Sequence, residues 1–126
     1  MRTTGAAAVL LLASTLSAGE VVRFPFDSKV IFNSDFSGNH EIYMIRSDRL
    51  TRLTNHPAKD EYAVASRSGD KIVFHSDRNG NFDIFVLDLK TGGTIQVTAD
   101  SKNELTPSWS SDDSSILYNL ETGKNE

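Results

Sequence analysis

The chain has 126 residues, 38% of them hydrophobic and 24% charged, proportions that are ordinary for a globular domain with a buried core. Its net charge of -4 and its lysines and arginines scattered among acidic residues exclude the basic surface that a nucleic-acid partner requires. It has no cysteine, which is compatible with an oxidising compartment, and after residue 20 no apolar run is long enough to cross a bilayer.

The N-terminal residues form a segment of a different kind. Met1-Arg2 is followed by an apolar run over residues 5–13 and then by small residues through Gly19. This order is typical of a secretory signal peptide. A first helix or a membrane anchor is the alternative, but the run is too short to span. We predict a signal peptide over residues 1–19, a periplasmic or secreted mature chain, and no membrane span once the peptide is removed.

A repeat follows this segment. Residues 30–43 recur forty-two positions later as residues 72–85, and a third copy begins where Ser110, Ile116 and Tyr118 repeat Ser66, Ile72 and Phe74. A period of about 40 to 45 residues with short strands and Gly turns is typical of β-propeller blades. We predict an all-β fold of four-stranded antiparallel blades, about two and a half blades of an incomplete propeller. The expected limits are about residues 20–54 for blade 1, about 61–98 for blade 2, and a start at about 104 for blade 3, within a domain over 20–126.

The second copy divides into four expected strands. With the period of two that a strand imposes, Ile72 and Phe74 fall on one face of the second of them, whereas both faces of the third are largely apolar. The third strand is therefore expected to lie between neighbouring blades. The four strands are predicted at Glu61–Ser66, Lys71–Ser76, Phe82–Asp88 and Thr94–Thr98.

The turn between the second and third strands has the same pattern in two blades. Asp77 and Gly80 bound the turn in the second copy, as Asp35 and Gly38 do in the first. Such an Asp accepts backbone N–H groups, and the Gly permits a positive φ. A calcium loop is the alternative, but its template places Gly at the sixth position. Because the pattern occurs once per blade, we interpret these four residues as structural.

Strand direction predicts one face rich in loops. In an antiparallel four-stranded blade, the turns between second and third strands and the connections between blades emerge on the same side. Polar loops on a rigid scaffold are common recognition surfaces, and simple solvation is the alternative. The candidate interaction face comprises His40, Asn55, His56, Lys59, Asp60, Arg78, Asn79, Asp100, Lys102 and Asn103, together with Phe36.

No pattern for catalysis or metal binding is visible. The three histidines, His40, His56 and His75, lack metal-ligand spacing, and His75 is expected to face a neighbouring blade from its strand. There is no Gly-x-Ser-x-Gly nucleophile motif. We therefore predict no catalytic residue, no cofactor and no metal.

The repeat also resembles a known family. The pattern Ser-Asp-x-x-Gly-Asn-x-(Glu/Asp)-Ile-(Tyr/Phe) at residues 34–43 and 76–85, with Pro107-Ser108-Trp109-Ser110, is similar to the WD-like repeats of TolB-type periplasmic propellers. The resemblance covers about residues 20–119 and implies a propeller in the cell envelope. Ser111 and Asp113 stand where the family has Pro and Gly.

Two expectations about function follow. The first is a non-enzymatic binding or scaffold module that presents its loops to a protein or cell-envelope partner. The alternative is the N-terminal propeller fragment of an exported hydrolase of the prolyl-oligopeptidase type, or of an oligogalacturonate-lyase-like enzyme. Two and a half blades leave apolar faces open, so we expect either a fragment of a longer propeller or self-association that completes the ring.

Overall fold

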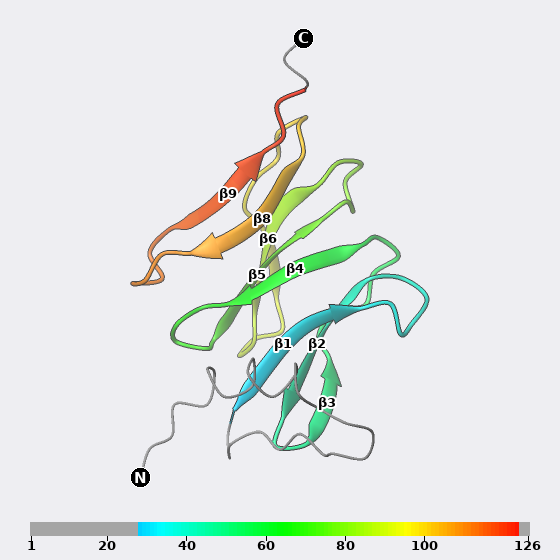
Figure 1. Cartoon of the computed structure of the whole chain (residues 1–126), viewed down its shortest axis with the longest axis vertical. Helices are drawn as coiled ribbons and strands as arrows, with labels where there is room; N and C mark the ends of the chain where they lie inside the picture. The colour runs from blue at the N-terminus through cyan, green and yellow to red at the C-terminus, as the bar shows by residue number, and fades with distance from the viewer. Residues whose placement is uncertain (1–27, 124–126) are drawn as a thin grey trace, which may run out of the picture.

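The computed structural model describes residues 28–123 as three antiparallel sheets and no helix. The predicted signal peptide and the expected first strand of blade 1 lie outside the described residues. The sheets follow one another along the molecule without closing into a ring, with blade 2 between the other two (Figure 1). The all-β blade architecture predicted from the repeat is confirmed. Blade 1 contains β1 (Lys29–Ser34), β2 (Glu41–Arg46) and β3 (Arg49–Arg52); blade 2 contains β4 (Asp60–Ala65), β5 (Lys71–Ser76), β6 (Asp83–Asp88) and β7 (Thr94–Gln96); blade 3 contains β8 (Glu104–Trp109) and β9 (Ile116–Leu120).

The observed strands of blade 2 agree closely with the predicted ones. β5 has the predicted limits, while β4 begins and ends one residue earlier and β6 begins one residue later. β7 ends at Gln96, before the predicted limit. Beyond it, the backbone N–H groups of Val97 and Thr98 both approach the Ile84 carbonyl oxygen, at 2.7 and 3.4 Å. Two donors on one acceptor end the regular ladder and turn the chain toward blade 3.

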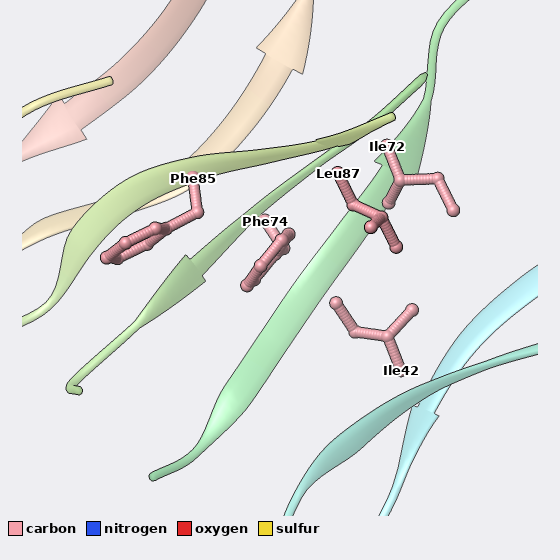
Figure 2. Close-up of a cluster of buried hydrophobic side chains, with 5 residues drawn as sticks. All are labelled: Ile42, Ile72, Phe74, Phe85 and Leu87. Atoms are coloured by element: carbon pink, nitrogen blue, oxygen red, sulfur yellow. The ribbon is translucent and has the colours of Figure 1, made fainter. Parts of the chain in front are cut away.

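Two apolar clusters hold the blades together. The first lies between blades 1 and 2 and consists of Ile42, Ile72, Phe74, Phe85 and Leu87, all buried (Figure 2). The second lies between blades 2 and 3. It contains Val73, Ile84 and Val86, against which Trp109 and Ile116 pack.

Alternate residues of β5 and β6 thus enter opposite clusters, as expected for strands covered on both faces. Burial of one such side chain is worth roughly 1.5–3 kcal/mol. Blade 2 is therefore the part of the molecule with the most complete packing.

The first strands of blades 2 and 3, β4 and β8, share one irregularity. The register of β4 on β5 shifts between Glu61 and Val64, where Tyr62 has φ of 54°, and the register of β8 shifts in the same way around Thr106, with φ of 49°. A bulge of this kind releases a backbone N–H from the ladder. The N–H of Thr106 donates instead to Nδ1 of His75 at 3.1 Å. His75 therefore faces blade 3 from its strand, as the repeat predicts.

Asp113 explains one departure from the family pattern. It occupies the left-handed region, with φ of 59°, at the position where Gly69 of blade 2 has φ of 75°. Its carboxylate accepts the backbone N–H groups of Arg67 at 2.7 Å and Ser68 at 2.9 Å. The bond from Arg67, and to a smaller extent the bond from Ser68, holds the pKa of Asp113 below its ordinary value. An aspartate in place of the family's Gly therefore links the turns of blades 2 and 3.

Candidate interaction face

The loops predicted to share one face do so. The His40 carbonyl oxygen accepts the backbone N–H of Asp60 at 2.9 Å, and the Asp77 carboxylate accepts the backbone N–H of Lys59 at 2.8 Å. Each bond joins a turn inside a blade to a connection between blades. We call this surface, formed by residues 35–40, 53–59, 77–82 and 97–103, the loop face.

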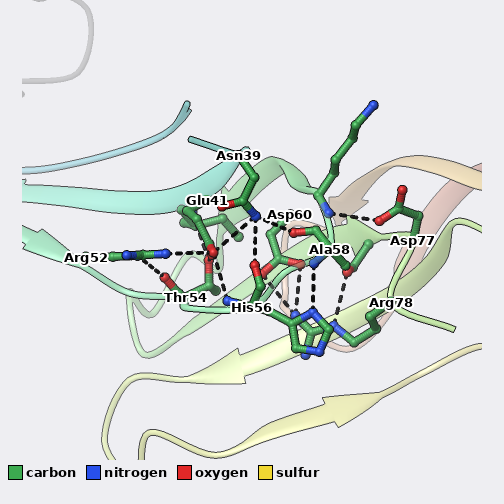
Figure 3. Close-up of polar contacts among 12 residues, drawn as sticks. Asn39, Glu41, Arg52, Thr54, His56, Ala58, Asp60, Asp77 and Arg78 are labelled. Atoms are coloured by element: carbon green, nitrogen blue, oxygen red, sulfur yellow. Dashed lines mark hydrogen bonds and ion pairs between the residues drawn. The ribbon is translucent and has the colours of Figure 1, made fainter. Parts of the chain in front are cut away.

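A buried carboxylate organises the connection from blade 1 to blade 2. Glu41, at the start of β2, accepts hydrogen bonds from Arg52 Nη2 at 2.8 Å, from the backbone N–H of His56 at 2.8 Å and from the Thr54 hydroxyl (Figure 3). Burial by itself raises the pKa of Glu41, but the bonds from Thr54, His56, Arg52 and Asn39 together hold it below its ordinary value. The carboxylate stays charged and fixes the connection.

The same arrangement recurs in blade 2. Asp83 takes the place of Glu41 and accepts from Gln96 Nε2 at 3.0 Å and Asn81 Nδ2 at 3.2 Å. Asn81 Nδ2 also donates to the carbonyl oxygens of Asp100 and Lys102, at 2.9 and 2.8 Å. In blade 1, Asn39 makes the equivalent bonds. The Gly-Asn-x-(Glu/Asp) part of the repeat therefore supports the loops and is not itself a binding surface.

His56 also has a structural role in this arrangement. Its Nδ1 accepts the backbone N–H of Ala58 at 3.0 Å, as the Asp100 carboxylate accepts that of Lys102 at 3.1 Å. A histidine and an aspartate thus close the same two-residue turn in consecutive connections.

The prediction that Asp60 is an exposed contact residue is wrong. Its exposure is 0%, and both of its carboxylate oxygens accept from Arg78 Nη2, at 2.8 and 3.0 Å. The guanidinium in turn lies over the Phe85 and Phe74 rings, 4.6 and 5.6 Å from their centroids. This pairing neutralises a buried charge, so the side chains of Asp60 and Arg78 stabilise the interior of the blade.

The four turn residues have the predicted backbone geometry. Gly38 and Gly80 have φ of 102° and 106°, and their N–H groups donate to the carbonyl oxygens of Asp35 at 2.9 Å and Asp77 at 3.0 Å. The Asp77 carboxylate accepts the backbone N–H of Lys59, which belongs to the connection between blades and not to the Asp77 turn.

The exposed part of the loop face is smaller than the predicted set. Half-buried members are His40, His56 and Asn103, and Asn103 is held by bonds to Phe82 N and Glu121 Oε2. Phe36 is 71% exposed and packs edge-on against the Phe32 ring. The members that remain exposed are Asn55, Lys59, Asn79, Asp100 and Lys102.

Glu61 is a residue that the sequence reasoning missed. Its carboxylate oxygens lie 3.0 Å from His40 Nδ1 and 3.5 Å from His75 Nε2. Burial lowers the pKa of His75, and Glu61 opposes the shift. The three side chains come from three separated segments, so no spacing could have indicated them. Among residues 28–123, no group of three or more His, Asp or Glu side chains is placed to hold a metal ion, and no helix there could span a membrane.

Comparison with known proteins gives consistent results. The profile of a family described as TolB beta propeller domain matches residues 22–126. A TolB-type protein from Agrobacterium tumefaciens has a similar structure, with a TM-score of 0.69 and 19% identity, over 74% of this chain and 34% of that one. TolB from Acinetobacter baumannii has a TM-score of 0.60 and 24% identity, over 71% of this chain and 23% of that one. Both likenesses concern the fold, and the chain spans about a third or less of each. No curated protein matches the chain.

Proposed function

Because the chain belongs to the TolB beta propeller domain family, we propose that it is a non-catalytic binding module. Its loop face would contact a protein or another component of the cell envelope, in the periplasm or outside the cell. The predicted signal peptide over residues 1–19 supports this location.

One observation carries the proposal. Exposed polar side chains with charges of both signs stand on connections that hydrogen bonds to Glu41 and from Asn81 hold in place. Lys59 and Lys102 are exposed in equivalent connections, beside the bonded backbones of His56 and Asp100. A surface that is ordered before binding loses less conformational entropy when a partner docks. The rigid connections therefore favour recognition over simple solvation.

Site-specific photo-crosslinking tests this function. Benzoylphenylalanine would replace Lys59 or Lys102, and the protein would be irradiated in an envelope extract of the source cells. We expect one discrete crosslinked product from both positions, because they lie on the same face. Lys90 is the matched control, since it is an exposed lysine in the turn between β6 and β7, at the other end of blade 2.

Two results would count against the module. Crosslinking of Lys90 to the same product with equal yield would place the contact elsewhere or mark it as non-specific. An absence of product from Lys59 and Lys102 in envelope, periplasmic and medium fractions would remove the loop face as a binding surface.

A further inference from the structure

His75 joins blade 2 to blade 3 through one nitrogen of its ring. Its Nδ1 accepts the backbone N–H of Thr106 at 3.1 Å, and the two residues belong to β5 and β8. A ring nitrogen accepts a hydrogen bond only while it carries no proton. His75 is therefore neutral, with its proton on Nε2, and the bond to Thr106 exists only in that form.

This bond holds the bulge of β8 against blade 2. Thr106 lies where the register of β8 on β9 shifts, between Leu105 and Ser108. Its φ of 49° is strained for a β-branched residue. The Thr106 hydroxyl accepts from Asn119 Nδ2 at 2.7 Å within blade 3, so the bond to His75 is the one that reaches the other blade. Losing it would release the bulge from blade 2.

The position of the His75 ring opposes protonation. The ring is 2% exposed and contacts the rings of Tyr62 and Phe82, whose centroids lie 5.0 and 4.8 Å away. Burial is the largest effect on this side chain and lowers the pKa of His75. The closed contact between blades 2 and 3 therefore excludes the proton.

Two carboxylates act in the opposite direction. Glu61 of β4 places Oε2 at 3.5 Å from His75 Nε2, and Asp77 of the turn after β5 adds a weaker attraction for the imidazolium. From blade 1, His40 shares the Glu61 carboxylate, with its Nδ1 at 3.0 Å from Oε1. From β8, His75 meets the uncharged N–H of Thr106. A proton that does reach the ring is thus stabilised by nearby negative charge.

The other two blades have an amide at the equivalent position. Asn33 of blade 1 lies forty-two positions before His75, and Asn119 of blade 3 lies forty-four positions after it. An asparagine side chain offers a carbonyl oxygen as an acceptor and does not titrate. Among the three equivalent positions, blade 2 alone has a side chain that can gain a proton near neutral pH.

We propose that His75 is a pH-sensitive latch between blades 2 and 3. In its neutral form Nδ1 holds the Thr106 N–H and keeps the β8 bulge against blade 2. When the ring gains a proton, Nδ1 becomes a donor that faces another donor, so the bond is lost and the bulge is released. Because residues 97–103 lead directly into β8, opening also loosens this connection of the loop face. Control of partner binding by the latch rests on the proposed function.

Acid favours the open form. With the latch open, the His75 ring is in water, where its pKa is about 6.5, whereas burial in the closed form lowers that pKa. The open form therefore binds the proton more tightly, and the closed form is most favoured above about pH 6.5. Each pH unit below this value raises the ratio of open to closed molecules by up to about tenfold, until pH reaches the pKa of the closed form.

Hydrogen exchange of backbone amides in the full chain tests the latch. Between pH 7.5 and pH 5.5, we expect the protection factor of the Thr106 amide to fall by about tenfold. His75→Asn introduces the residue of the other two blades, and there the change should be less than about twofold. The Val97 amide, which donates to the Ile84 carbonyl oxygen at 2.7 Å inside blade 2, is the internal control. An equal fall at Thr106 in both proteins would overturn the proposal.

The ring signals of the wild-type protein test the same step without relying on a variant. Nitrogen NMR should show Nδ1 without a proton at pH 7.5, and the ring should titrate with the same midpoint as the loss of Thr106 protection. Glu61→Gln removes a charge that favours the imidazolium, so it should move both midpoints to lower pH. A proton on Nδ1 at pH 7.5, or Thr106 protection that does not follow the His75 titration, would contradict the latch.

The latch and the loop face can fail separately, because exchange at Thr106 involves no partner. If the latch controls binding, the ratio of the Lys102 to the Lys59 crosslinked product should be lower at pH 5.5 than at pH 7.5 in the wild type and constant in His75→Asn. A constant ratio in both would remove the control of binding and leave the latch. Loss of Thr106 protection with no crosslinked product at any pH would leave the latch and remove the loop face as a partner surface.

Discussion

Blades 2 and 3 present the same repeat in two different surroundings. In β5, Val73 and Phe74 are fully buried, whereas their equivalents in β9, Leu117 and Tyr118, are 64% and 42% exposed. Both strands have apolar residues at these positions, so local pattern does not account for the difference. β5 is paired with β4 and β6 and covered by two apolar clusters, while β9 pairs with β8. Burial in this fold depends on neighbouring strands and blades.

The largest expected contrast is between Phe74 and Tyr118. Phe74→Ala should destabilise the protein by about 3–5 kcal/mol, because it opens a cavity in the first cluster. Tyr118→Ala should cost less than about 1 kcal/mol, because much of that ring is already in water. Urea denaturation followed by circular dichroism measures both. Equal losses would mean that β9 is covered in solution, for example by a second copy of the chain.

Asp60 and Glu104, the buried acids that begin β4 and β8, should respond in different ways. Asp60→Asn should cost about 2–4 kcal/mol, because it leaves the largely covered Arg78 without its counter-charge. Glu104→Gln should be neutral or stabilising, since it removes a buried charge that has no partner within residues 28–123. Thermal unfolding of both variants beside the wild type makes the comparison. A loss for Glu104→Gln as large as that for Asp60→Asn would show that Glu104 is already paired in solution.

Backbone conformation separates two exposed glycines. Gly80 and Gly123 both have open space around the position of an added Cβ, but only Gly80 of this pair has a positive φ, 106°. Gly80→Ala should therefore cost about 1–2 kcal/mol, and Gly123→Ala should be close to neutral. Unfolding midpoints in urea test this, and similar values for the two variants would mean that the blade 2 turn differs in solution from the structure.

The smallest expected effect concerns pH and the turns of blades 2 and 3. The folded-state pKa of Asp113 is lowered, so its contribution to stability is present above its unfolded pKa, about 3.9, and is lost as pH falls through the folded value. At pH 6 the wild type should melt at a higher temperature than Asp113→Asn, and this difference should become smaller below about pH 4. A constant difference would mean that the bonds to Arg67 and Ser68 do not depend on the charge.

The sequence predicted the scaffold better than the candidate site. The apolar runs bounded by Gly turns predicted strands at residues 71–76 and 82–88 and located β5 and β6 within one residue, because strands covered on both faces are apolar on both sides. The bulges at Tyr62 and Thr106 were not predictable, since neither residue type marks a positive φ. The loop face was placed correctly by strand direction. Its composition was not, because Asp60 looked like a polar loop residue and is buried against Arg78.

The sequence by itself determined the repeat length, the strands and the Asp-x-x-Gly turns, because each depends on neighbours a few positions away or on one period. The tertiary structure decided which equivalent positions are buried, where Glu61 meets two histidines, and why Asp60 is paired while Glu104 has no partner within the described residues. The contacts of Glu61 and Asp60 join residues fourteen to twenty-one positions apart. Identical local patterns therefore acquire different energies once one blade is covered and the next is not.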